Sequence, residues 1–167
     1  MSGGIKCACK IAGVLVVALA LAACSRQAQP KQYGLGGEGP VQPGTSRDFA
    51  VNVGDVVLFL VDSSSLTGEA QGILRNQARW LNQYPQYTIL IEGHADERGT
   101  REYNIALGAR RAISVRNFLA AQGVNQGRLR TISYGKERPV ATCDDISCWS
   151  QNRRAKTNLN NAAVARY

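Results

Sequence analysis

Apolar residues follow a strand-like pattern in four places between residues 50 and 160. Residues 56–61 form a continuous apolar run rich in β-branched side chains, which predicts a buried strand. Shorter runs at residues 87–92 and 129–134 predict two further strands. Apolar and polar residues alternate weakly at residues 155–160, which is the pattern of a half-exposed fourth strand.

Two longer stretches repeat their apolar residues at helical spacing. Residues 66–84 predict one helix, preceded or capped by Ser63, Ser64 and Ser65 and followed by Pro85. Residues 101–122 predict a second helix, with Thr100 as its cap and Gly123 at its end. The order of elements predicts an α+β sandwich, in which two main helices pack on one face of a mixed four-stranded sheet.

The first 23 residues have the composition of an export signal. Lys6 and Lys10 precede an apolar run at residues 11–23, which is too short to span a bilayer comfortably. Cys24 follows small residues there and resembles the lipidated cysteine of a bacterial lipobox, although an ordinary signal with an incidental cysteine is the alternative. Ser25 replaces the Asp of many inner-membrane retention signals, and this resemblance implies sorting to the outer membrane.

The remainder divides by composition into three parts. Residues 24–49 are rich in Gly, Pro, Gln and Ser and predict a flexible tether. Residues 50–160 form one predicted domain, and residues 161–167 form a tail. The net charge of +8 would suit nucleic acid, but the basic residues are scattered rather than paired with aromatic strands. For an exported chain, a membrane surface or a carboxylate-rich cell wall is the better polyanion.

The five cysteines separate into groups with different fates. Cys7 and Cys9 belong to the predicted signal, and Cys24 to the predicted anchor. Cys143 and Cys148 remain in an oxidising compartment, where they predict a disulfide. Zinc is the alternative for this pair, but such a site needs about four ligands and the chain has one histidine.

The second predicted helix places a cation on its apolar side. At about 100° per residue, its apolar residues form a single stripe that should face the sheet. Arg111 lies inside this stripe, whereas Arg110 and Arg116 lie outside it. A guanidinium there requires an acid or an anionic ligand, and Asp96 in the preceding loop is placed to supply the acid. The pair would form either an internal ion pair, with a snorkelling Arg111 as a variant, or a dipolar pocket for a zwitterion.

Other candidate groups have simpler interpretations. His94 with neighbouring acids resembles metal ligands, but no HExxH motif is present. A serine hydrolase would need the elbow sequence G-x-S-x-G, which the chain lacks. Residues 152–154 predict a short helix against the pocket rather than ligand contacts, and Trp80 and Trp149 are interpreted as packing residues.

Three stretches of the sequence closely resemble one known family. They are GHADERGTREYNIALGARRA at residues 93–112, TISYGKERPV at 131–140 and SQNRRA at 150–155. The family is that of the peptidoglycan-associated lipoproteins of the Tol-Pal system, within the larger group of OmpA-like domains. The match covers about residues 50–156 and extends to the lipobox and tether.

The resemblance implies noncovalent binding of the peptidoglycan stem peptide, with the side chain of meso-diaminopimelate held by Asp96 and Arg111. The other matching contact positions are Arg98, Thr100, Leu107 and Asp62. Val61 stands where the family commonly has Phe, so the resemblance does not extend to an aromatic wall at this position. Lys156 and Asn158 replace residues that are often apolar in relatives, and we therefore expect the last strand to be an exposed edge.

The resemblance further implies partners but no catalysis, cofactor or metal. The expected partners are TolB and other Tol proteins, peptidoglycan and, through the lipid anchor, the outer membrane. The expected role is to link membrane and wall and to support constriction during division. Two alternatives are an amidase or hydrolase acting on the same wall, and a general OmpA-like wall anchor without Tol partners.

Overall fold

The computed structural model describes residues 40–161, and the folded unit begins at Pro40. A short helix, α2 (Ser46–Asp48), and a π-helical turn, η2 (Phe49–Val53), precede the first strand. Phe49 is buried in the core, so the last part of the predicted tether belongs to the domain. The predicted signal, Cys24, the tether up to residue 39 and residues 162–167 lie outside the described residues.

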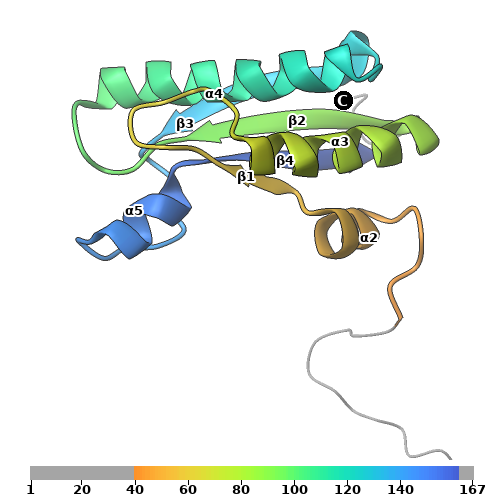
Figure 1. Ribbon diagram of the computed structural model, residues 1–167, viewed down its shortest axis with the longest axis horizontal. Helices are drawn as coiled ribbons and strands as arrows, with labels where there is room; N and C mark the ends of the chain where they lie inside the picture. Colours follow the sequence, from red (N-terminus) through yellow and green to blue (C-terminus); the bar gives the residue numbers. More distant parts are fainter. Residues whose placement is uncertain (1–39, 162–167) are drawn as a thin grey trace, which may run out of the picture. The chain divides into compact units, whose positions relative to one another are not determined.

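Four strands form one mixed sheet in the order β1-β4-β2-β3. They are β1 (Val56–Leu58), β2 (Tyr87–His94), β3 (Leu129–Gly135) and β4 (Arg154–Asn161). β2 and β3 are parallel, whereas β4 is antiparallel to both β1 and β2. Two long helices, α3 (Gly68–Gln83) and α4 (Arg101–Ala121), lie along one face of this sheet (Figure 1). The predicted α+β sandwich is therefore confirmed.

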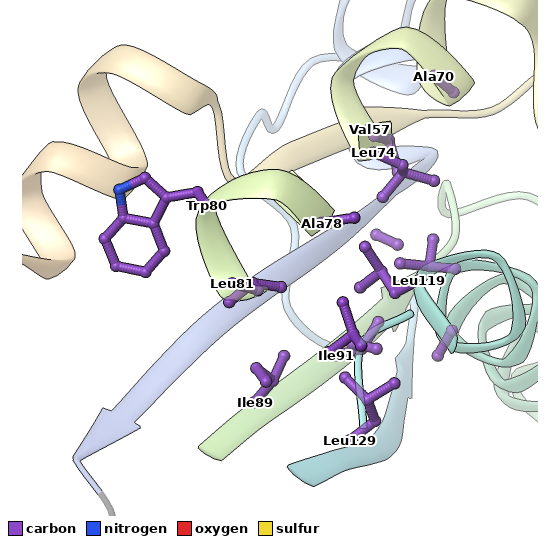
Figure 2. Close-up of a cluster of buried hydrophobic side chains, with 14 of the residues drawn as sticks. Val57, Ala70, Leu74, Ala78, Trp80, Leu81, Ile89, Ile91, Leu119 and Leu129 are labelled. Carbon is purple, nitrogen blue, oxygen red and sulfur yellow. The ribbon is translucent and has the colours of Figure 1, made fainter. Parts of the chain in front are cut away.

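The core lies between this face of the sheet and the two long helices. Figure 2 shows Leu74 and Leu81 of α3 and Leu119 of α4 directed toward Ile89 and Ile91 of β2. Trp80 points away from this group toward α2, where its ring nitrogen donates to Asp48 at 2.8 Å and its ring lies 5.0 Å from that of Phe49. The prediction that Trp80 is a packing residue is confirmed.

α4 and β2 approach each other through two glycines. A Cβ atom on Gly93 would lie 1.8 Å from the carbonyl oxygen of Gly108, and a Cβ on Gly108 would lie 2.4 Å from the Ser133 hydroxyl. That hydroxyl donates to the carbonyl of Ile105 at 2.7 Å, which adds a polar tie between β3 and α4. The main chains of helix and strand are therefore in direct contact, and no larger residue fits at either position.

The ends of α4 follow local sequence chemistry. The Thr100 hydroxyl accepts from the Tyr103 N–H at 3.2 Å, as predicted for a helix cap. Gly123, with a φ of 88°, follows the other end in a left-handed conformation that glycine adopts without strain. The serines at residues 63–65 precede α3, which is one of the two predicted arrangements, and Thr67 supplies the capping oxygen. The helix therefore begins two residues later than the apolar spacing indicates.

The predictions for the first and the last strands of the sheet were wrong. Pairing in β1 extends only to Leu58, and Leu60 and Val61 beyond it are exposed, so the apolar run at residues 56–61 is not a buried strand. β1 is instead an edge strand with apolar residues on both faces. β4, expected at an exposed edge, lies between β1 and β2. Its polar residues Lys156 and Asn158 face away from the helices, and the alternation of a strand does not identify its neighbours.

Two short helices complete the described residues. η3 (Gln126–Arg128) leads into β3, and α5 (Ile146–Asn152) immediately precedes β4. α5 lies beyond the end of the sheet at which β4 begins (Figure 1). In the described part of the chain, no helix combines the length and apolar character needed to cross a bilayer.

Candidate functional site

A pocket of about 210 Å³ lies where the loop after β1, the loop after β2 and the first turns of α4 meet. Its walls bring together five of the six binding residues that the resemblance implies. These are Asp62, Asp96, Arg98, Leu107 and Arg111. We call this the Asp96 pocket. The sixth residue, Thr100, is exposed and does not line it, and its hydroxyl serves as the cap of α4.

Arg111 is fully buried at the inner side of this pocket, on the apolar stripe of α4, as its position along the helix predicts. Three of its N–H groups donate to main-chain carbonyls. The acceptors are Ser63 at 2.8 Å, His94 at 2.7 Å and Leu60 at 3.1 Å. Its guanidinium carbon also lies 5.2 Å from the centre of the Phe59 ring. Burial lowers the pKa of Arg111 to about 10, with the charge of Asp96 acting in the opposite direction.

These bonds correct one expectation from the sequence. A buried guanidinium was expected to require an acid or an anionic ligand, but here main-chain carbonyl oxygens accept its hydrogen bonds. These carbonyls belong to the loop after β1 and to the end of β2, which surround the apolar stripe of α4 at the position of Arg111. Two of the five guanidinium N–H groups remain for a further acceptor. Among the described residues, no ion pair joins Arg111 to Asp96.

Asp96 is held by two other arginines. Arg98 donates from Nε at 3.2 Å and from Nη2 at 2.7 Å, and Arg153 donates from Nη1 at 3.4 Å. Burial acts to raise the pKa of Asp96, but the hydrogen bonds and charge of Arg98 and the bond from Arg153 outweigh it. The pKa is therefore lowered, and the carboxylate is charged at neutral pH.

Arg153 is a residue that sequence reasoning underrated. It was interpreted as part of a short packing helix, yet it follows the last residue of α5 and reaches two elements. Its Nε donates to the carbonyl of Phe59 at 3.1 Å while its Nη1 contacts Asp96. It is 7% exposed, so it supports the pocket from behind. The only sequence signal for this role was the matching NRRA motif.

Arg98 connects the pocket to α5. Its guanidinium carbon lies 4.4 Å from the centre of the Trp149 ring, within the range of a cation–π contact. The Trp149 ring nitrogen donates in turn to the carboxylate of Glu97. Trp149, interpreted from the sequence as a packing residue, provides a platform for Arg98 instead.

Asp62 and Tyr103 meet at the outer rim of the pocket. The Tyr103 hydroxyl donates to the Asp62 carboxylate, and this bond raises the pKa of Tyr103. Asp62 has a φ of 52°, which is uncommon for a residue other than glycine and turns the chain sharply after β1. Tyr103 is 45% exposed and was not among the predicted site residues. A helical wheel placed it at the margin of the stripe, which gave no signal of a contact with another loop.

The main-chain carbonyl and the ring of His94 have different surroundings. Its carbonyl accepts from Arg111, whereas its ring lies 3.6 Å from the Glu92 carboxylate and lines a separate pocket. The acids that follow His94 in the sequence point elsewhere, Asp96 to its arginines and Glu97 to Trp149. The sequence neighbours that resembled metal ligands therefore do not converge.

Cys143 and Cys148 are joined in a disulfide, as predicted. It closes a short loop at the start of α5, where the Asp145 carboxylate caps the helix by accepting from the Ser147 N–H at 2.7 Å. Asp145 and the two sulfur atoms lie close together, but the bonded cysteines supply no thiolates for zinc.

Comparison with known proteins agrees with this architecture. The profile of the OmpA family matches residues 58–153. A peptidoglycan-associated lipoprotein of Mesorhizobium japonicum is 60% identical over 151 residues, which cover 89% of this chain and 90% of the relative. One of Agrobacterium fabrum is 58% identical and covers 90% of this chain and 87% of the relative.

Solved structures agree as well. The crystal structure of the peptidoglycan-associated lipoprotein from Burkholderia pseudomallei is 44% identical, with a TM-score of 0.62, and covers 64% of this chain and 90% of that one. The C-terminal domain of Helicobacter pylori MotB, at 24% identity and a TM-score of 0.60 over 64% of this chain and 84% of that one, shares the fold. The chain therefore belongs to the OmpA family and, within it, to the peptidoglycan-associated lipoproteins.

Proposed function

We propose that this domain binds peptidoglycan noncovalently and that the Asp96 pocket receives the side chain of meso-diaminopimelate from the stem peptide. One observation carries the proposal: Asp96 and Arg111 line the same pocket without pairing with each other. A diaminopimelate side chain ends in an ammonium and a carboxylate. A pocket that presents one acid and one guanidinium is complementary to such a zwitterion.

Each charged group has donors or acceptors left for the ligand. The two N–H groups of Arg111 that make no carbonyl bond are assigned to the ligand carboxylate. A carboxylate has about four acceptor sites, so Asp96 can accept from the ligand ammonium while it keeps Arg98 and Arg153. The depressed pKa of Asp96 supports this role, because the carboxylate stays charged at neutral pH.

The remaining predicted residues take different parts. Leu107, which is 5% exposed, is assigned to the methylene chain of the ligand, and Arg98 holds Asp96 in place. Asp62 and Tyr103 form the rim. Thr100 acts indirectly, by fixing the start of α4. Val61 lines the pocket where relatives commonly have Phe, so the wall at this point is aliphatic.

The family is non-enzymatic, so the proposed role of the domain is that of an anchor. Lipidation of Cys24 would attach the chain to the outer membrane, and the tether would let the domain reach the wall. We extend the proposal to the Tol-Pal system: TolB and other Tol proteins as partners, and support of envelope integrity and of constriction during division. Labelling with palmitate that is lost in Cys24→Ser, and recovery of TolB with the purified chain, test these two parts.

Binding to purified cell walls tests the pocket. The full chain in mild detergent is incubated with diaminopimelate-type sacculi and with lysine-type sacculi, and bound protein is measured after sedimentation. We expect retention on the first type, and at least about a tenfold weaker affinity for the second, which lacks the distal carboxylate. Equal affinity for the two wall types would contradict the role of Arg111.

Asp96→Asn is the sharpest variant, because it removes the charge and keeps the shape. It should lose most wall binding, while Asp144→Asn, which changes an exposed acid of the loop before α5, should keep it. Circular dichroism of both variants checks that they fold. If folded Asp96→Asn binds diaminopimelate-type walls as the unmodified chain does, the pocket assignment is wrong. Release of soluble muropeptides during incubation would contradict the anchor role.

A further inference from the structure

A second and larger pocket, of about 470 Å³, lies on the face of the sheet opposite to α3 and α4. Strand alternation places its side chains there. Val57 and Ile91 point into the core, so their neighbours Val56, Leu58 and Glu92 point to the other face. The residues after β3 and the end of α5 close its sides through Arg138, Val140 and Gln151. We call this the Arg154 pocket.

Arg154 is the distinctive residue of this pocket. It is 5% exposed and lies on β4, beside Leu58 in the pairing of β1 with β4. Its Nη2 donates to the carbonyl of Arg138 at 3.1 Å, but its Nε and Nη1 are buried and have no hydrogen-bond partner. A buried charged donor without an acceptor is costly, so retained donors of this kind point to an acceptor that binds there.

His94 adds a second group of the same kind. Its ring is 2% exposed, and although Nε2 lies 3.6 Å from the Glu92 carboxylate, neither ring nitrogen makes a hydrogen bond. Within the described residues, Arg154 and His94 are the only side chains with such buried and unpartnered nitrogens, and both line this one pocket. Their coincidence distinguishes the pocket from an ordinary groove of the surface.

The charge of the lining favours an anion of low charge. Three cationic side chains, Arg138, Arg154 and Lys156, face one carboxylate, that of Glu92. Lys156 also lies 3.7 Å from Asp55, which offsets part of its charge. With Asp55 counted, three cations and two carboxylates leave a net charge of +1, which matches one negative charge better than the two that a phosphate monoester carries at neutral pH.

The apolar part of the lining indicates what is attached to the anion. Leu58 is 50% exposed and Val140 is 60% exposed, and both contribute to the walls together with Val56 and Pro139. Burying apolar side chains of this size against a ligand favours binding. The pocket therefore has room and affinity for a short aliphatic group next to the anion.

We propose that the Arg154 pocket is a second ligand site, which binds a carboxylate carried on a short apolar group. The carboxylate accepts from Nε and Nη1 of Arg154, and the aliphatic group lies against Leu58 and Val140. The C-terminal residue of a peptide and a short acyl chain share this chemistry. The site is separate from the proposed peptidoglycan pocket and does not depend on it.

Titration of the full chain with small carboxylates tests the site. The probes are N-acetyl-leucine for a peptide terminus, hexanoate for an acyl chain, and inorganic phosphate as the competing anion. We expect both carboxylates to shift the NMR resonance of the Arg154 Nε–H at concentrations up to about 10 mM and phosphate to do so at least about tenfold more weakly. The tighter of the two carboxylates identifies the source of the ligand, and either order supports the site.

Variants separate this site from general charge effects. Arg154→Met should lower carboxylate affinity by at least about tenfold. Arg130→Met, which removes an exposed arginine of β3 outside the pocket, should leave it unchanged. If Arg154→Met does not fold, the Arg154 Nε–H resonance of the unmodified chain decides the matter. An unshifted resonance, phosphate binding as tight as that of the carboxylates, or full affinity in Arg154→Met would overturn the proposal.

Discussion

Arg111 and Arg154 are both buried, yet they differ in how many of their nitrogens make hydrogen bonds. Arg111 donates to three main-chain carbonyls within the Asp96 pocket. Arg154, on the opposite face of the sheet, has one carbonyl partner and two nitrogens without any. Burial of a guanidinium alone therefore does not show how many of its donors remain for a ligand. The number of donors that the fold leaves unsatisfied is the more informative quantity.

The contrast starts from two adjacent residues. Arg153 and Arg154 follow α5 directly, and because successive side chains of an extended chain alternate, they point to opposite sides. Arg153 reaches Asp96 and the carbonyl of Phe59, whereas Arg154 enters the other pocket. The end of α5 thus serves both pockets.

The largest expected effect is on Arg111. Replacing it by Met should lower the free energy of unfolding by about 3–5 kcal/mol, because three buried carbonyls lose their donors. Urea denaturation followed by circular dichroism measures the change. A loss under about 1 kcal/mol would mean that the carbonyl bonds contribute little and that the two arginines are alike.

His94 should make the stability of the domain depend on pH. Burial, followed by the charges of Arg154, Arg138 and Lys156, lowers the pKa of His94 to about 4. Between this value and the ordinary pKa near 6.5, the unfolded state binds the proton and the folded state does not. Stability should therefore fall by at most about 3 kcal/mol as the pH falls through this range.

The measurement compares urea midpoints near neutral pH and near pH 4.5 for the unmodified chain and for His94→Gln. The variant has no imidazole to protonate, so its stability should change less over the same range. If the urea midpoints of the two proteins fall equally between neutral pH and pH 4.5, another group is responsible for the loss of stability.

Reduction of the disulfide should affect both pockets through α5. Opening the loop between Cys143 and Cys148 costs about 2 kcal/mol in the chain-entropy model. Thermal unfolding with and without reductant measures this loss, and the double variant Cys143→Ser with Cys148→Ser is its control. If reduction alters binding in one pocket only, the end of α5 does not position both.

The smallest expected effect is on Arg154. Arg154→Met should change the free energy of unfolding by less than about 1 kcal/mol, or increase it, because the substitution removes a buried charge that the fold does not satisfy. Denaturation beside Arg111→Met gives the comparison directly. A loss as large as that of Arg111→Met would mean that Arg154 has partners in solution that satisfy its donors.

The sequence predicted features that depend on neighbouring residues. The cap at Thr100, the end at Gly123 and the buried position of Arg111 follow from local chemistry and helical spacing, and the disulfide follows from two cysteines in one short loop of a chain predicted to be exported. The resemblance to a family supplied the residues around Asp96, and their role in binding is still a prediction.

Features that depend on distant main chain could not be predicted in this way. The carbonyls that accept from Arg111 belong to Leu60, Ser63 and His94, and main-chain groups carry no signal in a residue pattern. The contact between Asp96 and Arg153 spans 57 positions. The central place of β4 depends on its pairing with β1 and β2, which its own alternation does not specify.

The contact between Gly93 and Gly108 has a consequence for the ligand binding proposed at the Asp96 pocket. Because the two main chains touch, α4 cannot move closer to β2, and the bond from Arg111 to the His94 carbonyl joins the same two elements. The approach of α4 to β2 therefore sets the depth of the Asp96 pocket. Under the proposed function, a ligand of a different length would have to be accommodated at the rim, by the exposed pair of Asp62 and Tyr103.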